Sequence, residues 1–210
     1  MTDKAFLEQL ISEGEHQQQD FKYKIQDARK LAKSVSAFAN TAGGRLLIGV
    51  RDDGVLSGVR SDEEIYMMHK AAYECCMPAS EISFRTCHAD GRIIVIATIP
   101  PASHRPVTAI DDDGRHRAYV RIHDENIVAS PVHLEIWRQE RQAQGMMRYA
   151  DKEAHFIEVL RRQPPLTLNR IVRLTRTGRY RVIGMLARLI RYELVDCTFD
   201  GHSFLFALKR

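Results

Sequence analysis

The sequence predicts a mixed α+β body over residues 1–130, followed by a separate domain of three helices and a hairpin over residues 151–210. In the body, helical and strand periodicities of apolar residues are interleaved, which is typical of α+β and α/β proteins. Residues 131–150, which include Trp137, are predicted to form a connecting helix. With 210 residues, 44% of them hydrophobic and 28% charged, the chain has the length and composition of one large or two small globular domains.

The elements of the body follow from the spacing of apolar residues and from the turn residues between them. They are, in order, a helix over residues 4–12, a strand over 20–25, a helix from 27 to about 41, a strand over 45–50, a helix over 61–77, a hairpin over 81–100 and a hairpin over 109–122.

Local signals set the boundaries of these elements. Asp27 is placed to cap the second helix, and Gly43 and Gly44 end it as residues that tolerate a left-handed backbone. The run RLLIGV is nearly all apolar, which is typical of a strand covered on both faces. The two hairpins turn at Asp90-Gly91 and Asp113-Gly114.

The last sixty residues have a different rhythm. Helices are predicted over residues 151–162, 167–175 and 179–195, with a tight turn at Thr177-Gly178 before the third. A hairpin over 195–209 then turns at Asp200-Gly201. Three helices, a short turn and a terminal hairpin describe a winged helix-turn-helix domain.

The charge of the chain is divided unevenly between the two parts. Residues 151–210 contain 12 Lys and Arg against 6 Asp and Glu, a net charge of +6, whereas residues 1–150 contain 19 against 21, a net charge of −2. Between Val159 and Tyr192 there are nine arginines and no acidic residue. A basic domain on a weakly acidic body favours a polyanionic partner. The alternatives are a solvated arginine-rich face and a winged helix used for protein–protein contact.

The third helix of the tail is the predicted recognition helix, because this helix of the motif enters the major groove with its N-terminal end at the base edges. With its apolar stripe turned inward, Arg181, Gly184, Arg188 and Arg191 share the outer face. We expect Arg181 and Arg188 to read bases, because the arginine fork binds guanine edges bidentately. The remaining predicted nucleic-acid contacts, chiefly to phosphates, are Arg170, Arg173, Arg176, Arg179, Arg191 and His202. Gly184 indicates close approach of the backbone to DNA or to a packed neighbour.

The body carries the pattern SAFANTAGGRLLIGVRDDGVLSGV, with Ala37 to Thr41, Gly43-Gly44 and Gly49-Val50 at fixed spacing. This pattern resembles the core of the Schlafen AlbA-like DNA-binding domain family, also labelled divergent AAA. The block Ala118 to Arg121 resembles a later aromatic–x–Arg element of that family. The resemblance covers roughly residues 12–130 and implies an AlbA-like mixed-sheet body. A following winged helix is common in bacterial members, which are usually described as transcriptional regulators.

The same resemblance implies an alternative activity, because some vertebrate Schlafen relatives are RNA endonucleases with three active-site carboxylates. By position these match Glu15, Asp20 and Asp52. Clustered carboxylates can hold Mg²⁺ or Mn²⁺ and activate water for phosphodiester cleavage. The sequence departs from the family pattern in having Asp20 where Glu is usual and Arg51 where another acid is frequent.

Two other kinds of site receive little support. The segment TAGGRLLIGV lacks the GK[ST] of a phosphate-binding loop, and its glycines precede a strand rather than a helix. Asn40 and Thr41 fit a helix cap better than a ligand contact. Cys75, Cys76, Cys87 and His88 contain no CxxC spacing, so buried thiols are a simpler interpretation than zinc.

The sequence predicts a cytoplasmic protein with reduced thiols, since no secretory leader and no apolar run of membrane-spanning length is present. The favoured function is DNA binding by a transcriptional regulator, with RNA as an alternative nucleic-acid partner. A homodimer would place two winged helices on neighbouring half-sites. The alternative functions are the metal-dependent nuclease and a ligand-sensing module whose body binds a small molecule.

Overall fold

The computed structural model describes residues 2–141, 151–162 and 165–209. The chain divides into two compact units, Met1–Val128 and Ala129–Arg210. No helix among the described residues is long and apolar enough to cross a membrane.

The first unit contains two four-stranded sheets, ordered β1-β2-β5-β4 and β3-β6-β7-β8. β1 and β2 are parallel, and the other pairs in these sheets are antiparallel. This mixture confirms the predicted α+β class. The elements are α1 (Asp3–Ser12), β1 (Gln19–Lys22), α2 (Ala28–Asn40), β2 (Gly44–Ile48), α3 (Ser61–Tyr73), β3 (Cys76–Met77), β4 (Ser83–Ala89), β5 (Arg92–Ile99), β6 (Thr108–Ile110), β7 (His116–Ile122) and β8 (Glu125–Val128).

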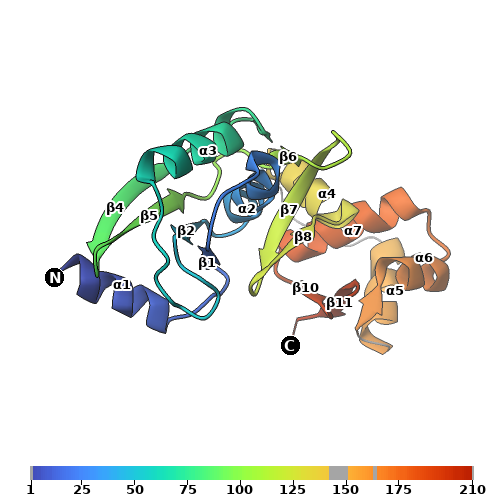
Figure 1. Ribbon diagram of the computed structural model, residues 1–210. Helices are drawn as coiled ribbons and strands as arrows, with labels where there is room; N and C mark the ends of the chain where they lie inside the picture. Colours follow the sequence, from blue (N-terminus) through green and yellow to red (C-terminus); the bar gives the residue numbers. More distant parts are fainter. Residues whose placement is uncertain (1, 142–150, 163–164, 210) are drawn as a thin grey trace. The chain divides into compact units, whose positions relative to one another are not determined.

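Strand β2 lies at the centre of the first sheet and is covered on both faces, as the run RLLIGV predicts. Leu46 and Ile48 belong to a core formed with α2 and α3, whereas Leu47 belongs to a second core formed with α1. All three side chains are fully buried. In Figure 1, α1 and α3 accordingly lie on opposite sides of this sheet.

The predicted boundaries of α2 are confirmed. The side chain of Asp27 accepts a hydrogen bond from the Arg29 backbone N–H at 2.8 Å, and Gly43 has a φ of +70° after the helix end. Gly44 has a different role from the predicted helix stop, because a Cβ there would overlap the Phe38 ring. The glycine pair therefore both ends the helix and lets the strand that follows pack closely against it.

The two predicted hairpins are present, with left-handed residues at Asp90, Gly91 and Gly114. Helix α3 is shorter than the predicted 61–77, since the chain leaves it at Glu74 and Cys76–Met77 instead pairs with β6. Strand β8, which pairs with β7 through the turn at His123, is not among the predicted elements. Its four residues are too few to show a clear alternation.

The second unit has one three-stranded antiparallel sheet, ordered β10-β11-β9, and its core includes Phe156, Ile171, Leu186 and Phe206. Part of the predicted connecting helix, residues 142–150, lies outside the described residues. The elements are α4 (Pro131–Glu140), α5 (Asp151–Arg162), β9 (Leu166–Thr167), α6 (Leu168–Thr175), α7 (Arg179–Arg191), β10 (Val195–Phe199) and β11 (Phe204–Leu208).

The turn between α6 and α7 uses a different residue from the one that the sequence suggests. Arg176 has the left-handed backbone, with φ of 49°, while Gly178 is the N-cap residue of α7 with φ of −57°. The prediction of a short turn before the third tail helix holds. The special backbone geometry falls two residues earlier.

Candidate nucleic-acid interface

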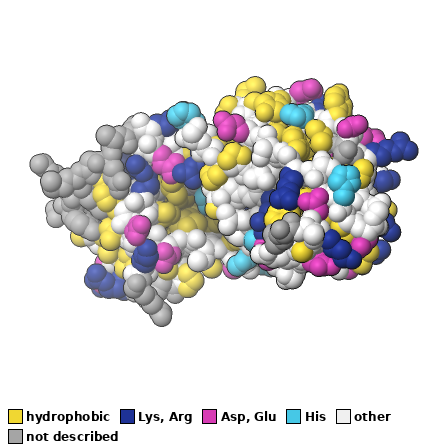
Figure 2. All heavy atoms as spheres, turned by 90° about the vertical axis from the view of Figure 1, so that its left-hand side faces the viewer, with side chains coloured by type: hydrophobic (Ala, Val, Ile, Leu, Met, Phe, Trp, Pro, Cys, Tyr) yellow, Lys and Arg dark blue, Asp and Glu magenta, His cyan; other side chains and the backbone are white. Residues whose placement is uncertain are grey.

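Five arginines form an exposed group on α6, on the turn after it and on the first turn of α7. We call this group the arginine surface, and its members are Arg170, Arg173, Arg176, Arg179 and Arg181. The Arg179 guanidinium donates a hydrogen bond to the Asn169 side chain at 2.5 Å, which ties the start of α7 to α6. Figure 2 shows basic and acidic side chains interspersed over one face of the molecule. The segment between Val159 and Tyr192 differs in containing arginines but no acidic residue.

Tyr180 lies between two members of the arginine surface and is 90% exposed. An aromatic side chain held in solvent among cations is suited to stacking on a base or packing on a sugar. Tyr180 is not among the nucleic-acid contacts predicted from the sequence. The sequence feature that could have identified Tyr180 is its position between two arginines, at the start of a helix whose apolar stripe begins at Val182.

The outer face of α7 is not uniformly open. Arg188 and Arg191 are half-buried and already take part in interactions within the chain. The Gly184 carbonyl accepts a hydrogen bond from the Gln139 side chain at 3.2 Å, and a Cβ at Gly184 would lie 3.9 Å from the Glu135 carboxylate. The close neighbour that Gly184 indicates is therefore α4.

His202 lies exposed at the tip of the β10–β11 hairpin. Its backbone N–H donates to the Asp200 carboxylate at 2.9 Å, and Ser203 donates to the same oxygen at 2.7 Å. These two bonds hold the pKa of Asp200 below its usual value. The hairpin tip therefore presents one histidine to solvent, with the acidic residue Asp200 beside it.

Two of the three predicted catalytic carboxylates, Glu15 and Asp20, lie together in the first unit. The Glu15 carboxylate accepts the Phe21 backbone N–H at 2.8 Å, and burial together with the adjacent Asp20 carboxyl raises the pKa of Glu15. Asp20 is buried and forms ion pairs with Lys22 at 2.5 Å and with Arg121 at 3.2 Å. The Asp20 oxygens are therefore already engaged by cations of the same chain.

Asp52, the third predicted carboxylate, is exposed in the turn that follows β2. It lines a hollow of about 510 Å³ with Tyr23, Arg51 and Asp53. Asp20 pairs with Leu46 in the middle of β2, whereas Asp52 lies beyond Ile48, the last residue of that strand. Within the described ranges, no three His, Cys, Asp or Glu side chains are grouped to hold a metal ion.

The cysteines lie in separate cores. Cys75 and Cys76 pack in the core with α2 and α3, whereas Cys87 packs in the core with α1 and the neighbouring His88 is exposed. Burial raises the pKa of all three thiols, that of Cys76 to about 12.

Residues of the AFANT block and of the aromatic–x–Arg block connect α2 to β7. The Asn40 side chain donates to the Val107 and Tyr119 carbonyls at 2.8 and 2.9 Å and accepts the Val107 N–H at 2.7 Å. The Thr41 hydroxyl accepts the Arg121 backbone N–H at 3.0 Å. These side chains satisfy buried backbone groups, so they hold the fold together.

The family model described as Schlafen, AlbA_2 matches residues 15–130, more than half of the chain. No curated protein matches significantly. Among solved structures, the DIP2311 protein from Corynebacterium diphtheriae is 15% identical with a TM-score of 0.48, and the match covers 90% of this chain and 34% of that one. The N-terminal domain of a RecG-related protein from Nitrosomonas europaea is 17% identical with a TM-score of 0.44, covering 72% of this chain and 97% of that one. On the evidence of the family model, the chain belongs to the Schlafen AlbA_2 family.

Proposed function

We propose that the protein is a transcriptional regulator that binds duplex DNA through the arginine surface of its second unit. The observation that carries this proposal is the group of five exposed arginines on α6 and the start of α7, in a segment without any acidic residue. Phosphate binding supplies most of the affinity of such surfaces. Membership of the Schlafen AlbA_2 family suggests nucleic acid as the class of partner.

The element order of the second unit supports a winged-helix interpretation. Helices α5, α6 and α7 are followed by the β10–β11 hairpin, and β9 pairs with β11. In this motif the N-terminal end of the second motif helix contacts base edges. That end of α7 carries Arg179, Tyr180 and Arg181 in exposed positions. Because α4 packs at Gly184, base contacts are assigned to this first turn rather than to Arg188.

The other exposed basic side chains serve to position the duplex. Arg170 and Arg173 lie on α6, Arg176 follows it and His202 lies at the hairpin tip. Contacts from such residues to phosphates fix the register of a protein on DNA without reading its sequence. A homodimer would set two such surfaces on half-sites about one helical turn apart.

Selection from random pools of duplex and single-stranded DNA and RNA tests this function. A regulator should enrich a duplex DNA sequence with two related half-sites, and the R179A/R181A variant should lose this enrichment. The R161A/R162A variant is a matched control, because it removes the same charge from α5, where both arginines pair with Glu158. Equal enrichment by parent and R179A/R181A would overturn the assignment of the first turn of α7.

A second candidate function is metal-dependent cleavage of RNA or DNA by Glu15, Asp20 and Asp52. The observation that favours it is the adjacent pair Glu15 and Asp20, in which burial and the neighbouring Asp20 carboxyl raise the pKa of Glu15. Paired carboxylates of this kind are common in acid–base and metal sites. Incubation of the protein with labelled RNA and DNA in the presence of Mg²⁺ or Mn²⁺ tests this candidate, and we expect the Asp52→Ala variant to be inactive. Absence of cleavage in either metal would remove this candidate.

A further inference from the structure

A hollow of about 980 Å³ in the first unit lies where four segments of the chain meet. We call it the Glu64 hollow. Its walls come from residues 24–26 after β1, residues 57–60 before α3, the first turns of α3, and residues 91–93 between β4 and β5. β1 and β2 are parallel, and the segments that leave their carboxyl ends both contribute to the hollow. In open α/β sheets, ligands bind beyond the carboxyl ends of the parallel strands, which is the end of β1 and β2 where the hollow lies.

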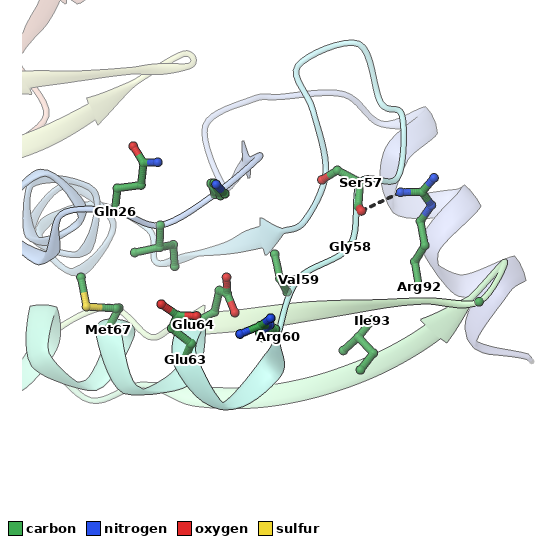
Figure 3. A pocket seen from close by; sticks show the side chains of 13 residues that line it. Gln26, Ser57, Gly58, Val59, Arg60, Glu63, Glu64, Met67, Arg92 and Ile93 are labelled. Carbon is green, nitrogen blue, oxygen red and sulfur yellow. Dashed lines mark hydrogen bonds between the residues drawn. The ribbon is translucent and has the colours of Figure 1, made fainter.

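A buried carboxylate without a full set of partners lies in the wall of this hollow. Glu64 is only 6% exposed, and its Oε2 atom has no hydrogen-bond partner in the described part of the chain. Burial raises the pKa of the Glu64 carboxyl. A buried polar atom is costly unless a donor satisfies it, so Glu64 Oε2 offers an open acceptor position to an N–H or O–H group of a ligand. Figure 3 shows Glu63 and Glu64 together with Arg60 at the start of α3.

Three exposed cations line the same hollow, namely Lys24, Arg60 and Arg92. Arg92 is held in place because its guanidinium donates to the Ser57 carbonyl at 2.6 Å, the dashed line in Figure 3. Gly58 permits this approach, since a Cβ there would lie 3.0 Å from the Arg92 Cβ. The loop is also fixed to β5 by the Val59 N–H, which donates to the Ile93 carbonyl at 3.0 Å. Arg92 and the loop before α3 therefore have fixed positions in the wall of the hollow.

We propose that the Glu64 hollow binds a nucleotide, with an N–H of the base donating to Glu64 and the phosphate held by Lys24, Arg60 and Arg92. A nucleotide combines the two groups that the hollow requires, a hydrogen-bond donor and an anion. The same chemistry is offered by a free nucleotide and by one unit of a single strand. An unpaired base presents every N–H of its Watson–Crick edge to Glu64, whereas a base pair leaves only the N–H that faces a groove.

A neighbouring feature favours the single strand as the source. Tyr23 precedes Lys24 in sequence and is 55% exposed, and it lines the second hollow with Arg51. An exposed aromatic ring beside a cation is the usual platform for a stacked base in proteins that bind single strands. The proposal rests on the proposed function only in taking nucleic acid as the ligand class. The Glu64 hollow belongs to the first unit, whereas the arginine surface belongs to the second.

Fluorescence anisotropy with labelled single-stranded octamers of DNA and RNA tests the proposal on the full chain. Calorimetric titration of the chain with each of the four nucleoside monophosphates forms the second arm of the experiment. Glu64→Gln keeps the size of the side chain but replaces an acceptor oxygen with an amide, and we expect it to weaken binding about tenfold. Glu74→Gln is the matched control, because Glu74 is exposed at the other end of α3. Both variants make the chain more positive by one charge, which alone would tighten binding of a polyanion.

The outcomes separate this proposal from the proposed function. Weakening by Glu64→Gln and by K24A/R60A, without loss of duplex binding, supports the Glu64 hollow as the site. Calorimetric binding of a nucleoside monophosphate, with no octamer bound, would assign the site to a free nucleotide. Equal or tighter binding by Glu64→Gln, or no binding of either ligand, overturns the proposal. Loss of duplex binding in R179A/R181A with octamer binding intact would show that the two sites are independent.

Discussion

The Arg121 guanidinium lies 3.2 Å from the Asp20 carboxylate, and the arginine side chain is almost completely buried. The same guanidinium donates to Asn126 at 3.0 Å and lies over the Phe38 ring, with 5.1 Å to the centroid. This pair joins β1 of the first sheet to β7 of the second. It also neutralises a residue that the family resemblance would assign to catalysis.

Removing Arg121 should therefore destabilise the first unit strongly. Arg121→Ala removes the buried partner of the Asp20 carboxylate and leaves only the half-buried Lys22, and the expected cost is about 3–5 kcal/mol in the free energy of unfolding. Urea denaturation followed by far-UV circular dichroism measures it. Arg138→Ala, which removes an exposed pair with Glu135, serves as the control and should leave the transition unchanged. Equal transitions for the two variants would contradict the structural role of Arg121.

Gly44 should not tolerate a side chain. Its added Cβ would overlap the buried Phe38 ring, so Gly44→Ala should cost about 1–3 kcal/mol of stability through overpacking. Gly178→Ala is the matched control, because no atom lies within 4 Å of the place that a Cβ would take there and its backbone is not left-handed. Its effect should be small. Thermal denaturation of both variants checks the difference, and a larger loss in Gly178→Ala would refute this explanation of the glycine pair.

The second unit should lose stability in mild acid. Burial lowers the pKa of His133 to about 4 from its ordinary 6.5, so the unfolded chain takes up a proton that the folded chain does not. Above pH 6.5 His133 is neutral in both states and does not affect the free energy of unfolding. As the pH falls from 6.5 toward 4, that free energy decreases by about 3 kcal/mol in all. Denaturation curves of the parent and of His133→Gln between pH 4 and 7 measure this. If the free energy of unfolding of the parent falls no more steeply with decreasing pH than that of the variant, the prediction is wrong.

Phosphate contacts should appear in the salt dependence of duplex binding. Each lost contact lowers the slope of log affinity against log salt by about 0.9. The R170A/R173A/R176A variant should therefore reduce the slope by about 3 and weaken binding to all sequences alike. Titrations of one specific and one unrelated duplex distinguish this from loss of specificity. A variant that discriminates less but keeps its slope would assign these arginines to base reading.

Sequence reasoning succeeded where the signal is local. The Asp27 cap, the glycine turns of the hairpins and the double-sided burial of β2 each depend on residues within one element or its immediate neighbours. It missed relations between elements far apart in the chain. The Arg121–Asp20 pair is of this kind, because nothing local distinguishes a buried arginine from a solvated one.

The same limit applies to the candidate site. Helical spacing predicts that Arg181, Gly184, Arg188 and Arg191 share a face, but it does not reveal that α4 packs at Gly184. Glu64 carries no sequence signal either, since it stands among acidic residues in the first turn of a helix, where exposed carboxylates are ordinary. Its burial becomes visible only when the segments after β1 and before α3 come together.

The most direct test of the central claim is the affinity of the full chain for a selected duplex, measured by fluorescence anisotropy across a range of salt concentrations. The parent should bind with a steep salt dependence, R179A/R181A should bind at least about tenfold more weakly, and R161A/R162A should bind like the parent. If R179A/R181A binds as tightly as the parent at every salt concentration, the arginine surface is not the DNA interface.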